Sequence, residues 1–575
     1  MSKTPKYDAK VKEILDSLKP GERTCELTGE KWVMDEEEIS YYKKFNVPPP
    51  KVAPKTRMVI VAAYGNSFQW WYQRHPKTGK QIITCVHPAS GIKVLPDKEW
   101  FDSDFSEITK DFDLNKSAFE IVRELQLAIP MTASRNMKEP ENSLCVVSLG
   151  DVNDILMMAC QARDSLFSIV LTKGESSAEV MFGDSVTNSY NISHSDRIFQ
   201  CNYLRDSHDC LNCSFLFDCR NCRDCFGAVN RRNAKYIFWD QQLTESEYQK
   251  KMEEIDLTCH SSVNQYRKRF HDMVAKAVWP ESFNVNAQDS VGEYLVDVVN
   301  CKYAYSCAHG PRDNYWTNFT YDQSEGNAYL DGGSGATNTY YSLGVSDSNS
   351  CKFCFGVSNC INLEYCMQCY NCENCFGCVG LQRKKFCIFN QQYLEEDYWV
   401  KVDELKCAML ERGGYGEFFP LSYSTAYFPE STAVWLGVGK PEFAARYGAK
   451  LFPITAEGAV GNKETGEART LSDIPDCIGE LSDDWAGQAI YDPEIDRRFA
   501  LFPQEIKFYR QMKLAPPARH FILRVKDLIA EANVAQYVDT TCAQCGAKIT
   551  VAKNTTYTDR KIYCHECYLK YLETR

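Results

Sequence analysis

The chain has 575 residues, a formal net charge of −12, 28 cysteines and a mean hydropathy of −0.41. A chain of this length exceeds what one hydrophobic core supports, so we expect several structural units. The acidic balance argues against a protein coated in nucleic acid, although it leaves local basic patches open. We find no run of about 18 apolar residues and no signal-peptide core, and we therefore expect a cytoplasmic protein that makes no contact with a membrane.

Residues 1–135 are predicted to form an N-terminal helix and a degenerate zinc-ribbon-like module. The segment after the helix begins with Cys25, but Thr28 occupies the second position of a zinc knuckle, and the stretch from His75 to Thr78 is incomplete in the same way. An isolated cysteine such as Cys25 is more often a small buried residue than a metal ligand. The helix predicted within Glu38–Pro50 ends in a proline run, because proline cannot continue a helix.

Residues 136–243 are predicted to form a first parallel β-solenoid, or β-helix. From Asn142 onward, turn-forming residues recur at steps of about 11 residues and separate short apolar pieces, which is typical of a solenoid. Two such steps, about 22 residues, would make one coil. Residues 244–285 are predicted to be a helical connector, whose start from Thr244 to Glu247 is close to a capping box.

Residues 286–393 are predicted to form a second β-solenoid, because this part of the chain is a duplication of the first. The segments Asn221–Tyr248 and Asn371–Tyr398 align without a gap and share cysteine, Phe-Gly and Gln-Gln positions. We expect residues 394–535 to form a helical cap and a mixed region. They contain Glu505–Pro517, whose sequence echoes Glu38–Pro50. The predicted class is therefore mainly β, with two duplicated solenoids, helical caps and a terminal zinc ribbon.

Residues 536–575 carry the strongest chemical motif. Cys542 and Cys545 form one C-x-x-C knuckle and Cys564 and Cys567 form another, 18 residues later. Two such knuckles can place four thiolates around one Zn²⁺ ion, with no open coordination position. We predict a structural zinc site, with redox chemistry as the weaker alternative.

Most of the remaining cysteines fall in two clusters, with many spacings of three or six residues, and two interpretations of them stay open. In a reducing compartment we expect thiols or metal ligands rather than disulfides. We favour small thiols packed inside successive coils, and the alternative is one or more zinc or iron–sulfur sites. The clusters lie within Cys201–Cys225 and Cys351–Cys387.

Two further features are candidates for function. Basic turns follow both cysteine clusters and could contact a partner, although a solvated turn is the simpler interpretation. Acidic residues of the second solenoid could act on a polysaccharide, but turn-forming aspartates are common in solenoids. The basic residues are Arg231, Arg232, Lys235, Arg383, Lys384 and Lys385, and the acidic ones are Asp297, Asp322, Asp331 and Asp347, with His309 and Arg312 nearby.

The repeated NC-x-x-CFG segment, the two proline-ended segments and the terminal ribbon resemble a family of large, cysteine-rich, zinc-ribbon-containing proteins common in candidate-phyla bacteria. The resemblance covers most of the chain. Members typically carry further knuckles around the proline-ended helices, where this chain has Thr28, Ala53 and Thr56 instead of cysteines. The resemblance therefore implies a zinc role for the terminal ribbon alone, and no established activity.

These features favour a non-enzymatic zinc-binding scaffold that presents an extended solenoid surface to a macromolecular partner, with protein favoured over nucleic acid. We identify no catalytic residue and no cofactor site other than zinc. The alternatives are a β-helix enzyme acting on polysaccharide and a nucleic-acid- or ribosome-associated factor. A homo-oligomer is compatible with all three.

Overall fold

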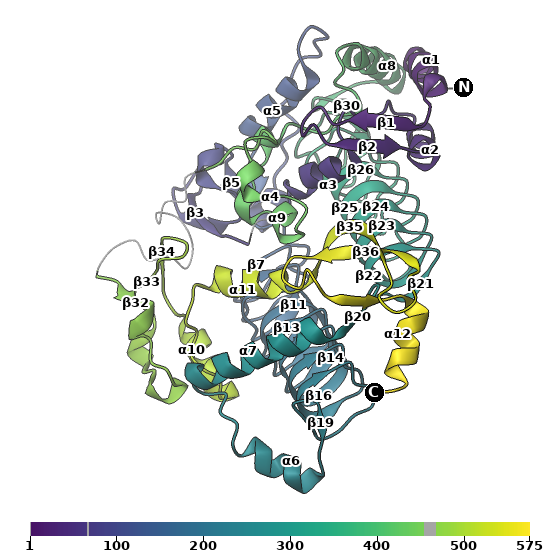
Figure 1. Ribbon diagram of the computed structural model, residues 1–575. Helices are drawn as coiled ribbons and strands as arrows, with labels where there is room; N and C mark the ends of the chain where they lie inside the picture. The colour runs from purple at the N-terminus through teal and green to yellow at the C-terminus, as the bar shows by residue number, and fades with distance from the viewer. Residues whose placement is uncertain (1, 66–67, 453–466) are drawn as a thin grey trace. The chain divides into compact units, whose positions relative to one another are not determined.

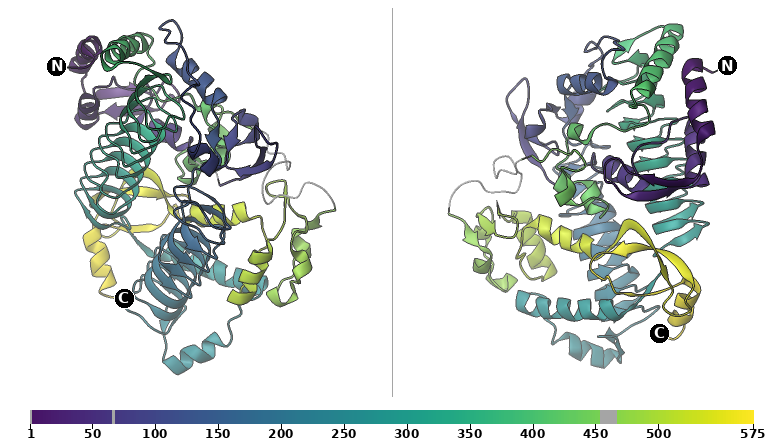
Figure 2. Two further views of the ribbon diagram at one scale, coloured as in Figure 1. Left: turned by 180° about the vertical axis from the view of Figure 1, so that it is seen from behind. Right: turned by 45° about the horizontal axis from the view of Figure 1, so that its top comes forward.

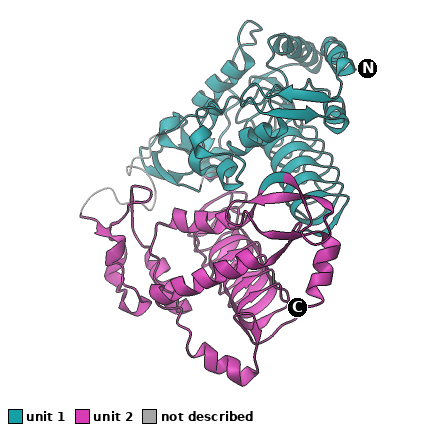
Figure 3. Cartoon of the chain, in the orientation of Figure 1, with its two compact units in different colours: residues 1–133, 284–453, 535–537 teal, residues 134–283, 454–534, 538–575 magenta. Residues whose placement is uncertain are grey.

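The computed structural model describes residues 2–65, 68–452 and 467–575, which form a mixed α/β protein with 26% helix and 34% strand (Figure 1). The chain divides into two compact units (Figure 3). Unit 1 comprises Met1–Ala133, Asn284–Pro453 and Ala535–Tyr537, and unit 2 comprises Ser134–Phe283, Ile454–Val534 and Val538–Arg575. Each unit joins pieces far apart in sequence. The six predicted segments stay a prediction, and residues 453–466 of the fifth lie outside the described residues.

Unit 1 combines N-terminal helices and hairpins with a ladder of parallel strands. The hydrophobic core of the unit joins the first helix to the ladder through side chains such as Val11, Tyr42, Tyr329 and Tyr365. The N-terminal elements are α1 (Pro5–Ser17), β1 (Gly21–Thr24), β2 (Lys31–Met34), α2 (Glu36–Phe45), α3 (Pro54–Ala62), β3 (Trp71–Arg74), β4 (Gln81–Thr84), β5 (Val94–Leu95), α4 (Asp97–Phe101), α5 (Ala118–Ala128) and β6 (Met131–Thr132).

The ladder of unit 1 consists of a seven-stranded and a four-stranded sheet, and helix α8 (Glu395–Glu411) follows it. All pairings are parallel except the last, between β30 and β31. The strands are β21 (Val285–Gln288), β22 (Val291–Val299), β23 (Lys302–Ala308), β24 (Tyr315–Tyr321), β25 (Ala328–Ser334), β26 (Tyr340–Ser346), β27 (Phe355–Ser358), β28 (Ile361–Glu364), β29 (Glu373–Phe376), β30 (Lys385–Ile388) and β31 (Gln391–Gln392).

Unit 2 has its own ladder, a 13-stranded sheet followed by α6 (Glu245–Met252) and α7 (His260–Lys276). Figure 2 shows the strands of each ladder piled one above another. The strands are β7 (Leu144–Val146), β8 (Ile155–Met158), β9 (Gln161–Arg163), β10 (Ile169–Glu175), β11 (Ala178–Asp184), β12 (Val186–Thr187), β13 (Tyr190–Ser193), β14 (Asp196–Phe199), β15 (Asn202–Arg205), β16 (His208–Phe217), β17 (Arg223–Val229), β18 (Ile237–Phe238) and β19 (Gln241–Gln242).

The C-terminal part of unit 2 adds short strands and helices. Strand β37 pairs in parallel with β20, which follows α7 in the chain. The elements are β20 (Val278–Pro280), β32 (Arg469–Thr470), β33 (Ile490–Asp492), β34 (Arg497–Phe499), α10 (Pro503–Met512), α11 (Phe521–Ala530), β36 (Lys548–Asn554), β37 (Lys561–Tyr563) and α12 (His565–Leu572). Strand β35 (Asn533–Thr541) belongs to unit 2 except for Ala535–Tyr537, which belong to unit 1.

The layers of both ladders repeat every 12 residues over most of their length, so the predicted coil of about 22 residues is wrong. Cys213 pairs with Cys225, and Leu343 pairs with Phe355. The prediction counted two steps between turns as one coil, whereas one step is a complete layer. A left-handed residue recurs at almost every third position, for example with φ of 50° at Asp206. Each such residue turns the chain sharply, so four three-residue sides complete one layer. Asn and Asp suit these corners because they tolerate the left-handed region better than most side chains do.

The predicted duplication has a structural counterpart at the end of each ladder. In unit 2, Phe238 pairs with Gln241 in an antiparallel bridge, and in unit 1 Ile388 pairs with Gln391 in the same way. A helix follows the Gln pair in each case, α6 or α8. The shared Gln-Gln segment therefore reverses the chain after the last parallel strand.

A buried arginine cluster shows that the duplication reaches beyond the ladders. In unit 1, Arg57 Nη2 donates to Glu38 Oε1 and to the hydroxyl of Tyr42, both at 2.7 Å, and the guanidinium lies 4.4 Å from the ring centre of Tyr329. Arg57 is fully buried. A buried guanidinium needs such partners, because an unpaired charge in the interior is very costly.

Unit 2 builds the same cluster from residues at equal spacing. Arg524 donates to Glu505 at 2.7 Å, to Glu179 at 2.7 Å and to the hydroxyl of Tyr509. Glu505, Tyr509 and Arg524 repeat the sequence spacing of Glu38, Tyr42 and Arg57, and Glu179 corresponds to Tyr329 in the duplicated ladders. Each unit thus pairs one ladder with one proline-ended helix.

Candidate metal centre

Four cysteines converge at the C-terminal end of unit 2. Cys542 follows β35, Cys545 lies three residues later, Cys564 is the N-cap of α12, and Cys567 lies in its first turn. Their sulfur atoms all lie within 4.8 Å of one another, and the Sγ atoms of Cys545 and Cys564 are 3.7 Å apart. Sulfurs at about 2.3 Å from a tetrahedral centre would lie about 3.8 Å apart. The group could therefore hold a metal ion.

A tight turn sets the geometry of the first knuckle. The amide of Cys542 donates to the carbonyl of Ala547 at 2.8 Å, and the amide of Gly546 donates back to the carbonyl of Cys542 at 2.9 Å. Gly546 has φ of 76°, a conformation in which a Cβ atom would be strained. Although burial raises the pKa of the Cys542 thiol, amide donors of Cys564, Cys545 and Gln544 bring it down to about 6. A thiolate, the form that binds metals, is therefore favoured.

The second knuckle gains from the start of α12. The amide groups of the first helical turn and the helix dipole favour negative charge there. The hydrogen bond with Cys564 nevertheless raises the pKa of the Cys567 thiol to about 12, so a metal ion has to displace this proton when it binds. A small core supports the site through Val278, Tyr563 and Tyr568. So small a core supplies little stability by itself, and a bound ion would supply part of the folding energy of this module.

Two incomplete knuckles occur in unit 1, where the sequence places them. Cys25 and His75 each repeat the turn of Cys542: their amides donate to Glu30 and Lys80, both at 2.8 Å, and the glycine four positions on donates back to the carbonyl. Thr28 and Thr78 stand in the second ligand positions. Cys25 is buried, as predicted, and its Sγ lies 3.6 Å from Thr56 Oγ1. Both places therefore keep the backbone turn of a zinc knuckle, although threonine replaces the second metal ligand.

The ladder cysteines occupy inward-facing rows with one residue per layer, and serines hold the same rows in earlier layers. Ser189 Oγ donates to the carbonyl of Thr187 at 2.8 Å and accepts from the amide of Cys201 at 3.1 Å. One layer on, Cys201 Sγ donates to the carbonyl of Phe199 at 3.3 Å and accepts from the amide of Cys213 at 3.3 Å. A spacing of three residues thus follows from the three-residue sides. A small side chain that both donates and accepts fits this narrow interior.

Within residues 2–65, 68–452 and 467–575, only two groups of three or more potential metal ligands converge. One is the four-cysteine group, and the other contains Cys259, Asp476 and Cys477. Neither includes a ladder cysteine. The geometry thus favours packing over a metal cluster for the ladder cysteines.

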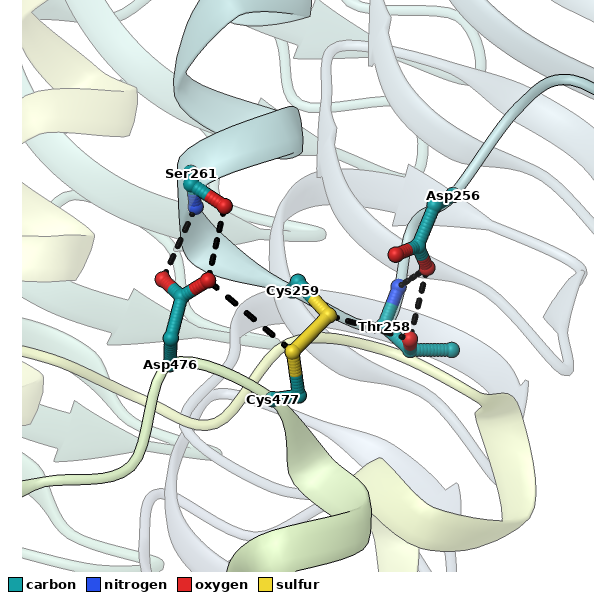
Figure 4. The surroundings of a disulfide bond; sticks show 6 residues. All are labelled: Asp256, Thr258, Cys259, Ser261, Asp476 and Cys477. Atoms are coloured by element: carbon teal, nitrogen blue, oxygen red, sulfur yellow. Dashed lines mark hydrogen bonds between the residues drawn. A yellow bond between two sulfur atoms is a disulfide. The ribbon is translucent and has the colours of Figure 1, made fainter.

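Cys259 and Cys477 form a disulfide, which the sequence analysis did not predict (Figure 4). The expectation that all cysteines are thiols or metal ligands is therefore wrong for this pair. The two cysteines are 218 positions apart, and no repeat or spacing connects them. The weak sequence signal is that both lie outside the two clusters and the ribbon.

The first basic turn lies against the terminal helix. Arg231 donates to Asp240 at 3.0 Å and to the carbonyl of Arg575 at 2.7 Å, and Arg232 pairs with buried Asp218 at 2.9 Å. These contacts within unit 2 neutralise part of the positive charge of the turn. Lys235, from the same turn, is exposed.

The second basic turn is also partly paired. Lys384 lies 3.6 Å from Asp104, Lys385 forms an ion pair with Glu373 at 2.5 Å, and Arg383 is exposed. A contact of either basic turn with a partner stays a prediction.

The acidic candidates of unit 1 do not share one environment. Asp297, Asp322 and Asp347 are exposed, and Asp322 lies 3.7 Å from His309. Asp331 is buried, and burial raises the pKa of its carboxyl to about 7. Catalysis by these residues stays untested.

The fold and the site define a cysteine-rich, mixed α/β protein with parallel sheets and a C-terminal four-cysteine group able to hold a metal ion. No helix among the described residues is both long and apolar enough to cross a membrane. No family model matches the sequence. No curated protein matches it either.

One solved structure shows a partial likeness, a "putative acetyltransferase" from Desulfovibrio desulfuricans G20. The match covers 42% of this chain and 63% of that chain, with 9% identity and a TM-score of 0.10. This chain thus spans less than two thirds of that protein. A likeness this weak carries no argument about fold or function.

Proposed function

We propose that the protein is a non-enzymatic zinc-binding scaffold, whose two ladders are β-solenoids that present their outer faces to a protein partner. The observation that carries the proposal is the convergence of four thiols from two knuckles, which leaves no open ligand position. The proposal includes membership of the cysteine-rich, zinc-ribbon-containing family. The duplicated ladder ends and the two proline-ended helices support that membership.

Zinc fits the four-cysteine group better than other common ions do. Four thiolates in a tetrahedral arrangement suit Zn²⁺, whereas Mg²⁺ and Ca²⁺ prefer oxygen ligands. A site closed by four protein ligands stabilises a fold rather than activating water. We therefore assign the zinc a structural role in the module formed by β37, α12 and the first knuckle.

We also propose a binding surface on the ladder of unit 1, a row of partly or largely exposed residues that we name the outer row. It runs through residues paired from layer to layer: Val299, Arg312, Glu325, Thr337, Asn349, Ile361, Glu373 and Lys385. Both charges and two apolar residues occur in it, and of the latter Val299 is 40% and Ile361 54% exposed. A row of this composition suits a protein surface better than a phosphate backbone, which would require a series of cations.

Metal analysis of the purified chain tests the zinc site. We expect about one zinc ion per chain prepared under oxidising conditions, and its loss in Cys542→Ser/Cys545→Ser. Cys407→Ser removes a thiol from α8 in unit 1 and serves as the control that keeps the zinc. Wild-type protein without zinc, or zinc retained in the double variant, would contradict the assignment.

Binding experiments test the scaffold role. Partners are captured on the immobilised full chain and identified, and their affinity is then measured for Ile361→Glu and for Val33→Glu. Val33 is 69% exposed on β2 and lies outside the outer row. We expect Ile361→Glu to lower the affinity for the partner at least about tenfold, which is the effect of losing one central apolar contact. Val33→Glu should leave the affinity unchanged. Equal affinities for the two variants would refute the outer row as the binding surface.

A further inference from the structure

The disulfide lies between two chain segments of unit 2 that pair by their backbones (Figure 4). The amide of His260 donates to the carbonyl of Asp476, and the amide of Ile478 donates to the carbonyl of Thr258, both at 2.9 Å. These bonds flank Cys259 and Cys477, which stand opposite each other in an antiparallel bridge. Because no thiol takes part in these bonds, the backbone can hold both cysteines side by side in either redox state.

Asp476 is fixed beside the two sulfurs. Its carboxylate accepts from the amide of Ser261 at 3.0 Å and from the hydroxyl of Ser261 at 2.7 Å, and so caps the start of α7 from another part of the chain. Ligand atoms of Cys259, Cys477 and Asp476 all lie within 4.8 Å of one another. Two sulfurs and one carboxylate oxygen are a donor set that Zn²⁺ accepts.

We propose that Cys259, Cys477 and Asp476 form a second, redox-gated metal site. In the reduced chain the two thiolates and the carboxylate bind one zinc ion. Formation of the disulfide removes both sulfur ligands and releases the ion. The proposal does not depend on zinc in the terminal ribbon, because the two sites share no residue.

The position of Cys259 at a helix start supports this assignment. Cys259 is the N-cap of α7, just as Cys564 is the N-cap of α12 in the four-cysteine group. The helix dipole favours thiolates at both places. Asp476 adds a third negative charge to those of the two thiolates, so the site offers a cation three anionic ligands.

Water can supply the fourth ligand. Three protein ligands occupy three positions of a tetrahedral shell and leave one for it. Cys259 and Cys477 are both partly exposed, so a reductant, an oxidant and the ion have access to them.

A small phosphine can reduce the disulfide to two thiols. The phosphine attacks one sulfur, the disulfide takes up two electrons, and water supplies the oxygen of the phosphine oxide and the protons of the two thiols. Each thiol then loses its proton when zinc binds. In the opposite direction a small-molecule disulfide takes two electrons from the thiolates and two protons from water and becomes two thiols. The protein disulfide forms, and Zn²⁺ leaves.

The test compares zinc stoichiometry of the full chain before and after reduction. Protein is reduced with the phosphine, freed of it without air, and titrated with zinc against a chromophoric chelator. We expect about one more bound zinc ion in the reduced chain than in the oxidised chain. Cys477→Ser should lose this gain, and Cys407→Ser should keep it. Asp476→Asn should retain the disulfide but weaken the additional zinc about tenfold or more.

Three results would overturn the proposal. The first is equal stoichiometry for oxidised and reduced wild-type chain. The second is a gain that persists in Cys477→Ser, because the additional zinc would then be bound by other thiols. The third is unchanged zinc affinity in Asp476→Asn, which remains decisive even if Cys477→Ser does not fold.

Discussion

Replacing Cys201 distinguishes a packed thiol from a metal ligand in the ladder of unit 2. Cys201 is fully buried, and its sulfur accepts the amide of Cys213 and donates to the carbonyl of Phe199. In Cys201→Ala the Cys213 amide loses this acceptor, which costs about 1–3 kcal/mol, and the missing atom leaves a small void that adds about 1 kcal/mol. Cys201→Ser retains a donor and an acceptor, as Ser189 does one layer earlier, and should change stability by less than about 1 kcal/mol.

Thermal unfolding and metal content measure the outcome. We expect the melting temperature of Cys201→Ala to fall by roughly 5–10 °C and that of Cys201→Ser to stay close to wild type. Ser189→Ala is the matched control, and it should lose about as much as Cys201→Ala because Ser189 makes the same two contacts. If serine and alanine at position 201 are equally damaging, and both lower the metal content, the ladder thiols are ligands and the packing argument is refuted.

Three further predictions concern buried charge and backbone strain. Burial and, secondarily, the charge of Asp151 raise the pKa of Asp154 to about 8, against about 3.9 in an unfolded chain. Between pH 5 and 8 the folded state therefore holds a proton that the unfolded state has lost. The free energy of unfolding should fall by up to about 1.4 kcal/mol for each unit by which the pH rises through this range. Urea unfolding of Asp154→Asn should show no such fall. Arg57→Met should lower the unfolding free energy by about 3–5 kcal/mol because it leaves Glu38 without its cation, whereas Lys31→Met, which removes an exposed ion pair, should change nothing measurable. Lys513 ends α10 with φ of 52°, a strained conformation for a residue with a side chain. Lys513→Gly should therefore raise the free energy of unfolding by about 0.5–1 kcal/mol in the same assay. A lower free energy of unfolding would show that the lysine side chain contributes more than the strain costs.

The candidate metal centre could be predicted from sequence because its ligands are local. Cys542, Cys545, Cys564 and Cys567 fall within one short segment, so two knuckles and their separation suffice to define the site. The pair Cys259–Cys477 could not be predicted in this way. Its two halves meet only after the chain has passed through the whole ladder of unit 1.

The sequence predicted which ladder cysteines lie inside the ladders, but not how many residues form one layer. The spacing of three among the cysteines predicted an inner row of small residues, and Cys201, Cys213 and Cys225 lie in it. The number of residues per layer was overestimated, because a run of residues such as Asp206 and Asp209 in the left-handed region cannot be read from turn propensity alone. A sequence shows where corners are favoured, but the pairing of one layer with the next decides how many of them close the layer.

The sequence by itself determined the duplication, the incomplete knuckles and the terminal four-cysteine motif, since each depends on residue types at short, fixed spacings. Only the tertiary structure decided which parts belong together. The proline-ended helix that carries Glu505 packs with the first ladder through Arg524 and Glu179, and the one that carries Glu38 packs with the second through Arg57. Each buried arginine also takes one neighbour from its ladder, Tyr329 for Arg57 and Glu179 for Arg524, and local spacing does not show which ladder supplies it. The same reason explains why the disulfide, and with it the second metal site that we propose, became visible only in the folded chain.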